Sequence, residues 1–173
     1  MPSGSTHDER GVKQSFVFGV TGWKNAGKTT LTERLVAEFV RRGWRVATVK
    51  HAHHAADVDK PGTDSFRHRA AGALEVALVT GARYAIVREQ EEATLCEVLA
   101  RLAPADLVLV EGFKRDRHPK IEVRGKEAKP MAVREHNVVA IASDGPPVDA
   151  TLPWFRRDDI AGIADFIAAR KAG

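Results

Sequence analysis

The sequence contains one cysteine, Cys96, and no apolar run of about 18 residues. A lone cysteine cannot form an internal disulfide, which is typical of a reducing compartment such as the cytoplasm. The missing apolar run argues against a membrane-spanning helix. Residues 1–14 are polar and lack the apolar core of a secretory signal, so we expect a flexible tail there. We expect residues 15–173 to form one domain, with Cys96 buried in a helix.

Aromatic residues are also scarce, at 6% of the chain, but 43% of the residues are hydrophobic, which is enough for a buried core. Positive charge is in excess mainly in one place. The net charge is +4, whereas residues 113–134 alone contain eight Lys or Arg against three Asp or Glu. Such a local surplus suits a small anionic ligand or an acidic partner as well as it suits nucleic acid. Nucleic acid is therefore not the partner that composition favours.

Short apolar segments alternate with helical patterns along the chain. Segment 120–124 alternates apolar and charged residues, which is typical of an edge strand or a hairpin arm. The order of the elements predicts an α/β fold with a mostly parallel, doubly wound sheet and helices on both faces. We expect the other strands at 15–21, 44–50, 73–80, 84–88, 106–112 and 138–142, and helices around 31–40, 63–71, 92–102 and 158–171.

The connection between the first strand and the first helix matches the phosphate-binding pattern G-x-x-x-x-G-K-[ST] in full, which indicates a P-loop NTPase. Two glycines turn the backbone so that its N–H groups and the helix N-terminus face a triphosphate. Lys28 is placed to contact the β- and γ-phosphates, and Thr29 to bind Mg²⁺. The predicted nucleotide-binding residues of this loop are Gly22, Trp23, Lys24, Asn25, Ala26, Gly27, Lys28, Thr29 and Thr30.

Glu111 ends the strongly apolar strand at 106–112, and ligands of a parallel sheet gather at such strand ends. A buried carboxylate is costly without a partner, so we interpret Glu111 as a metal-binding or water-orienting group. A capping or salt-bridged carboxylate is the alternative. Glu111 and Lys28 are the candidate catalytic residues. Asp57 or Asp59, in the loop after the second strand, is a further candidate ligand for Mg²⁺.

The same loop contains His51, His53 and His54. Histidines are ligands of transition metals, but neighbouring histidines in a loop are more often solvent-facing or hydrogen-bonded. For the base, the chain lacks the N-K-x-D guanine signature. Asp144 follows a late buried strand and is a candidate for pairing with the guanine edge. The alternative is a turn-forming Asp before Gly145.

Several stretches together resemble the molybdopterin-guanine dinucleotide biosynthesis protein B (MobB) family. They are the phosphate loop from Val20 to Thr30, Val-Lys-His-x-His-His at 49–54, Asp-Lys-Pro-Gly-x-Asp-Ser at 59–65 and Val-Glu-Gly-Phe-Lys at 110–114. Many families share the loop alone, whereas the second and third stretches together are much more specific. The resemblance spans about residues 16–141.

The resemblance implies a GTP-binding accessory protein of molybdenum cofactor biosynthesis, typically a homodimer, with weak Mg²⁺-dependent GTP hydrolysis. It implies a partner guanylyltransferase (MobA) that joins GMP to molybdopterin. By position, residues 22–30 would bind GTP, and Asp59 and Glu111 would lie near its magnesium. The basic stretch 114–129 is then a candidate contact for molybdopterin or for the partner.

Two other enzyme classes stay open on the residues alone. The Val-Glu-Gly end of the strand at 106–112 also resembles that of dethiobiotin synthetase, so an ATP-using small-molecule kinase or ligase is one alternative. The histidines favour a metal-insertion GTPase as the other, although no cysteine lies beside them.

Overall fold

The computed structural model describes residues 15–52, 59–125, 130–131, 137–147 and 151–172. The chain divides into two compact units, one made of the residues up to 51 and from 101 onward, the other of residues 52–100. The expected tail, 1–14, lies outside the described residues. That residues 15–173 act as one domain stays a prediction.

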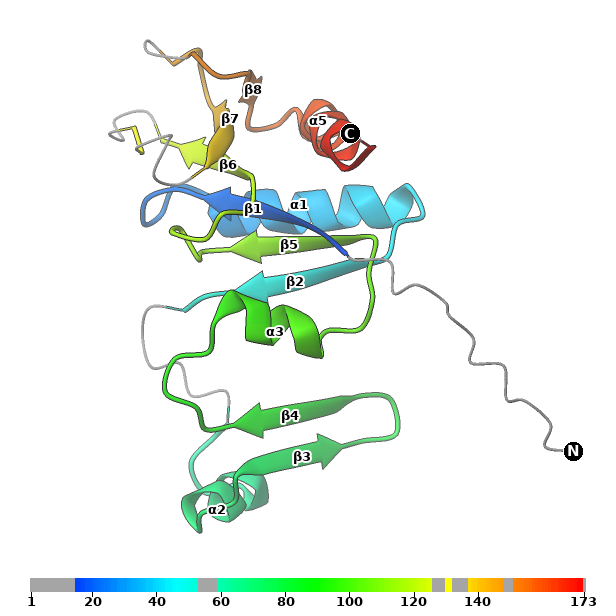
Figure 1. The fold of residues 1–173 in the computed structure, drawn as a ribbon, viewed down its shortest axis with the longest axis vertical. Helices are drawn as coiled ribbons and strands as arrows, with labels where there is room; N and C mark the ends of the chain where they lie inside the picture. Colours follow the sequence, from blue (N-terminus) through cyan, green and yellow to red (C-terminus); the bar gives the residue numbers. More distant parts are fainter. Residues whose placement is uncertain (1–14, 53–58, 126–129, 132–136, 148–150, 173) are drawn as a thin grey trace, which may run out of the picture. The chain divides into compact units, whose positions relative to one another are not determined.

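The first unit contains a six-stranded sheet in which every pairing is parallel. Its order is β2-β5-β1-β6-β7-β8, so β1 lies inside the sheet and the chain runs outward from it in both directions (Figure 1). Ligands of such sheets bind where the strand order reverses, at the carboxyl ends. The strands are β1 (Phe16–Thr21), β2 (Val46–Lys50), β5 (Leu107–Glu111), β6 (Lys120–Arg124), β7 (Val138–Ser143) and β8 (Trp154–Arg156).

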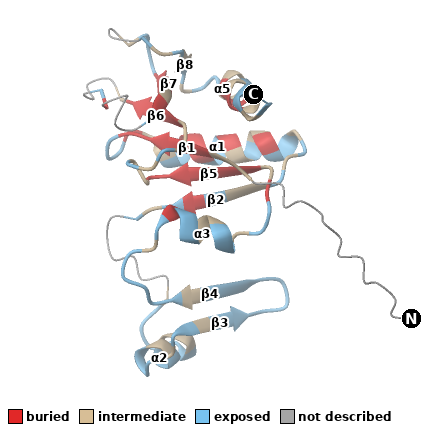
Figure 2. Cartoon of the chain, viewed as in Figure 1, coloured by how far each residue is buried: buried red, intermediate tan, exposed pale blue. Residues whose placement is uncertain are grey.

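Two helices, α1 (Lys28–Arg41) and α5 (Ile160–Ala172), pack on one face of this sheet. Their apolar stripes meet alternate side chains of the central strands, and Figure 2 shows burial concentrated on these elements. Burying each large side chain stabilises the fold by about 1.5–3 kcal/mol. The fully buried members of this core include Phe18, Val20, Leu35, Phe39, Leu107, Leu109, Ile121, Val123, Ile163 and Ile167.

The expectation of an edge strand or hairpin arm at 120–124 is wrong. Strand β6 lies between β1 and β7, parallel to both, and all of its residues are buried. The alternation of apolar and charged residues was misleading, because the charged side chains of β6 find hydrogen-bond partners inside the protein. The Lys120 ammonium donates to the carbonyls of Asp116 and His118. Glu122 accepts from Arg124 and from the backbone N–H of Met131. The strand β8 was not predicted.

The other strands and helices expected from the sequence are confirmed, with ends shifted by a few residues. In the second unit, β3 (Glu75–Val79) and β4 (Tyr84–Arg88) form an antiparallel pair. They are flanked in the chain by α2 (Asp64–Ala70) and α3 (Leu95–Arg101), the latter ending one residue past the boundary. Cys96, expected to be buried, is exposed on α3. None of the helices described is long and apolar enough to cross a bilayer.

His118 packs against the backbone of Gly19 in β1, where an added Cβ would come within 2.7 Å of its Nε2. Neither ring nitrogen has a hydrogen-bond partner among the described residues. Burial, and secondarily the neighbouring Lys120 ammonium, lowers the pKa of His118 from 6.5 to about 4. The folded protein therefore holds this imidazole neutral at pH values where the unfolded chain protonates it.

This difference predicts an acid-sensitive fold. Between pH 6.5 and 4 the unfolded chain binds a proton that folded His118 does not, so stability is lost as the pH falls. We expect the free energy of unfolding, measured in urea, to fall by up to about 3 kcal/mol more in the wild type than in His118→Gln between pH 7 and 4. Parallel pH profiles of the two proteins would contradict this.

Candidate functional site

The phosphate loop begins where β1 ends, and its first glycine is required by a close backbone approach. Gly22 has φ 148°, and a Cβ there would lie 2.4 Å from the Val123 carbonyl oxygen of β6. A side chain at this position would therefore displace the loop from the sheet. At the other end, Gly27 has φ 95° and is the N-cap of α1.

No side chain caps α1 among the described residues. The first N–H groups of a helix have no intrahelical acceptor, and they carry the positive end of the helix dipole. The loop connects β1 directly to α1, so the first turn of the helix lies near the carboxyl end of β1. The arrangement is that of an anion site, as the motif predicts.

The Lys28 ammonium donates a 2.8 Å hydrogen bond to the Trp23 carbonyl oxygen, so it is folded over its own loop. Its pKa is lowered mainly by burial, and further by the neighbouring Lys114 and Lys50 cations, while the Glu111 carboxylate opposes the shift. Three lysines therefore gather around one carboxylate. Lys114 also lies over the half-exposed Trp23 ring, 5.2 Å from its centroid. This end of the loop suits several negative charges at once.

Thr29 and Glu111, separated by 82 positions, meet at the carboxyl ends of the strands. The Thr29 hydroxyl is 2.9 Å and 3.1 Å from the two Glu111 carboxylate oxygens, and the Lys50 ammonium is 3.9 Å from one of them. Glu111 is buried, and its backbone carbonyl accepts from the His51 N–H at 2.8 Å. The sequence interpretation had placed both residues at a metal, and the fold does bring them together. Hydroxyl and carboxylate oxygens are the donors that Mg²⁺ prefers, so the pair fits that ion.

The remaining candidates of the histidine loop belong to either unit or are outside the described residues. Asp59 belongs to the second unit, where its carboxylate accepts from Thr63 at 3.1 Å and from Ser65 at 2.8 Å. Its role as a magnesium ligand stays a prediction. The His51 ring stacks on Phe113 with centroids 4.5 Å apart. Asp57, His53 and His54 are not among the described residues, and within the described part no three His, Cys, Asp or Glu side chains gather.

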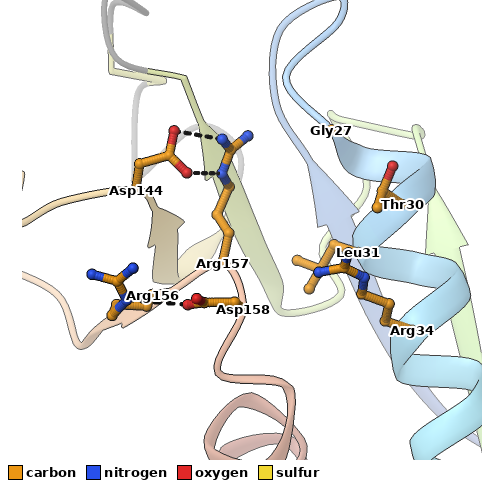
Figure 3. Close-up of a pocket in the computed structure, with 8 residues that line it drawn as sticks. All are labelled: Gly27, Thr30, Leu31, Arg34, Asp144, Arg156, Arg157 and Asp158. Atoms are coloured by element: carbon orange, nitrogen blue, oxygen red, sulfur yellow. Dashed lines mark hydrogen bonds and ion pairs between the residues drawn. The ribbon is translucent and has the colours of Figure 1, made fainter.

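A cavity of about 300 Å³ opens beside the loop, between the start of α1 and the segments that follow β7 and β8 (Figure 3). Asp144, the candidate base-reading residue, lies on its wall. Its carboxylate accepts two hydrogen bonds from Arg157, at 2.7 and 2.5 Å. The cavity is lined by Gly27, Thr30, Leu31, Arg34, Asp144, Arg156, Arg157 and Asp158.

Sequence reasoning missed several of these residues. Lys50 falls within an expected strand and Arg34 within an expected helix, and nothing in their local pattern distinguishes them. Arg156 and Arg157 lie in a short stretch that was assigned no element at all. The run of two arginines and two aspartates at 156–159 was a usable signal, since clustered opposite charges before a helix often pair across a site.

The model of the family described as molybdopterin guanine dinucleotide synthesis protein B matches residues 17–144. The chain belongs to this MobB family. The resemblance drawn from the sequence is thereby confirmed.

MobB relatives are similar over most of their length. A molybdopterin-guanine dinucleotide biosynthesis adapter protein of Haemophilus influenzae is 41% identical over 156 residues, covering 87% of this chain and 86% of that protein. An adapter protein of the same name from Escherichia coli is 36% identical over 160 residues, covering 87% of this chain and 90% of that protein.

Solved MobB structures share the fold. A crystal structure of molybdopterin-guanine biosynthesis protein B is 30% identical, with a TM-score of 0.72, and covers 91% of this chain and 100% of that one. A MobB homolog from Bacillus stearothermophilus is 30% identical, with a TM-score of 0.66, and covers 90% and 97%. The predicted fold class, an α/β P-loop NTPase with a mostly parallel sheet, is confirmed.

Proposed function

We propose that this MobB chain is an adapter protein of molybdopterin guanine dinucleotide biosynthesis that binds GTP with Mg²⁺ at its phosphate loop. One observation carries the nucleotide part of the proposal. The loop ends at an uncapped helix N-terminus, with Lys28 and Thr29 beside the buried Glu111 carboxylate. The family membership and the names of the relatives support the pathway part.

Within this site each side chain has a distinct task. Lys28 would release the Trp23 carbonyl and contact the β- and γ-phosphates, while Lys50 adds positive charge beside them. Thr29 and Glu111 would hold Mg²⁺, which when bound neutralises phosphate charge, and Asp59 is a third candidate ligand. Glu111 would also orient water, and no other side chain is assigned that task or the task of an arginine finger. Hydrolysis of GTP is therefore proposed to be slow, as suits an accessory protein rather than an enzyme proper.

The partner we propose is a guanylyltransferase of the MobA type, with molybdopterin as a further ligand. The word adapter in the names of the relatives supports a partner enzyme. Molybdopterin carries a phosphate, and Arg115 and Arg117 are exposed cations that follow Lys114 in the chain. A cytoplasmic location agrees with such a role and with the lone thiol.

We further propose a homodimer formed through the β3–β4 pair. Its strands are paired with each other, and one face presents the neighbouring side chains of Val79, Tyr84 and Ile86, at 73%, 73% and 59% exposure. An apolar face this exposed is unusual for a monomer. A second copy of the same hairpin offers a matching apolar face, as a two-fold interface requires.

The proposed role of the phosphate loop predicts that a substitution of Lys28 changes nucleotide affinity without changing the stability of the fold. We expect Lys28→Ala to weaken binding of a non-hydrolysable GTP analogue about 100-fold, because charge-assisted contacts to phosphate are lost. Its urea midpoint should stay unchanged, since the hydrogen bond to Trp23 is solvent-exposed. Glu111→Gln should retain weak binding but lose its dependence on Mg²⁺. Lys171→Ala, at the far end of α5, is the matched control, and wild-type affinity in Lys28→Ala would remove Lys28 from the site.

The hairpin predicts the oligomeric state. We expect the double variant Val79→Lys, Ile86→Lys to sediment as a monomer at concentrations where the wild type is a dimer, because two charges would be buried in the interface. Ala82→Lys, in the turn between the strands, should leave the dimer intact. A double variant that remains dimeric would place the interface elsewhere.

A further inference from the structure

One arginine joins the wall of the cavity to the phosphate loop. Arg157 follows β8, and its backbone N–H donates to the Ser143 carbonyl at the end of β7. Its guanidinium donates from Nε and Nη2 to the two oxygens of Asp144 (Figure 3). The Nη1 group donates to the Ala26 carbonyl of the phosphate loop, at 3.1 Å. One rigid, planar group therefore connects Asp144 on the cavity wall to Ala26 in the phosphate loop.

Arg157 and Asp144 keep about a third or more of their side-chain surface exposed, at 34% and 39%. An ion pair with this exposure contributes little to folding stability. The neighbouring pair of Arg156 with Asp158 joins residues of a single segment, whereas Arg157 reaches a loop 131 positions away. The geometry of Arg157 is therefore better explained by what it holds in place than by stabilisation of the fold.

The held group is a carboxylate with unused capacity. An ionised carboxylate has about four acceptor sites, and Arg157 occupies two of those on Asp144. The edge of guanine presents two adjacent donors, the N1–H and the 2-amino group. Because Arg157 occupies the edge on which both oxygens could accept two parallel donors, the remaining sites on Asp144 suit one of these donors, such as the 2-amino group. A carboxylate held at a fixed angle on the cavity wall can accept it, whereas a freely rotating one would lose entropy on binding. Adenine presents an acceptor at N1 and is not complementary to it.

We infer that Arg157 is a positioning residue that orients Asp144 for the guanine edge and ties that contact to the phosphate loop through Ala26. The inference rests on the proposed binding of GTP and adds the residue through which base recognition and phosphate binding communicate. The guanidinium that holds the Asp144 carboxylate also fixes the carbonyl of Ala26 next to Gly27. Base and triphosphate are then bound as one ligand, with coupled affinities.

The test is calorimetric titration of the full-length protein and its variants with Mg²⁺ and four probes: a non-hydrolysable GTP analogue, the matching inosine and adenine analogues, and inorganic tripolyphosphate. Inosine lacks only the 2-amino group. Loss of one hydrogen bond to a charged acceptor corresponds to a preference for guanine over inosine of about tenfold. We expect Arg157→Ala to abolish this preference, and to weaken the GTP analogue about tenfold more than tripolyphosphate.

The conservative variant separates positioning from charge. Arg157→Lys keeps the positive charge near the loop but cannot hold both carboxylate oxygens, so it should not restore the guanine preference. Arg157→Lys also provides the test of the inference if Arg157→Ala does not fold. Arg45→Ala removes another exposed Arg–Asp pair, with Asp106 at the opposite ends of the strands, and should leave all four affinities unchanged.

Three failures are distinguishable. A wild type that binds none of the three nucleotides overturns the proposed GTP binding and this inference with it. A wild type that binds all three equally overturns guanine recognition at Asp144, and with it this inference, but leaves nucleotide binding in place. A wild type that prefers guanine, with the preference intact in both Arg157 variants, overturns the role of Arg157 alone.

Discussion

The parallel pairing of β1 with β5 determines where everything else in the site lies. Its register sets Val20 beside Glu111, so the chain leaves β1 next to the carboxylate that ends β5. The phosphate loop then turns back into α1 and returns Thr29 to that same carboxylate. Phe18 and Leu109 are register partners in this pairing, and both are buried in the core against α1, which stabilises the pairing.

Part of this arrangement could be predicted from the sequence, because local rules determine it. The glycine–lysine–threonine pattern fixes the loop, and an apolar strand that ends in a carboxylate fixes Glu111 beside it. The charged residues of β6 could not be placed this way, since Lys120 and Glu122 are satisfied by backbone groups that only the fold brings near. Arg157 was missed for a similar reason, because its contacts to Ala26 and Asp144 depend on how β8 returns to the sheet.

The first unit is thus organised around two neighbouring subsites along the start of α1. One is strongly cationic, with Lys28, Lys50 and Lys114 near a single carboxylate, and it suits phosphates and a metal. The other is the cavity beside Thr30, where arginines and aspartates are paired with each other and leave polar groups for a base. The second unit contributes an exposed apolar hairpin. In the proposed function, the first unit would bind the nucleotide and the hairpin would associate with a second copy.

The account depends most on guanine nucleotide binding by the isolated protein. The direct measurement is a calorimetric titration of the wild type with non-hydrolysable GTP and ATP analogues, each with and without Mg²⁺. We predict saturable, Mg²⁺-dependent binding of the GTP analogue and at least about tenfold weaker binding of the ATP analogue. The reason is that adenine has an acceptor at N1 and no 2-amino group, so it offers the Asp144 carboxylate no donor on that edge. Preference for the ATP analogue would contradict the account and favour a small-molecule kinase or ligase.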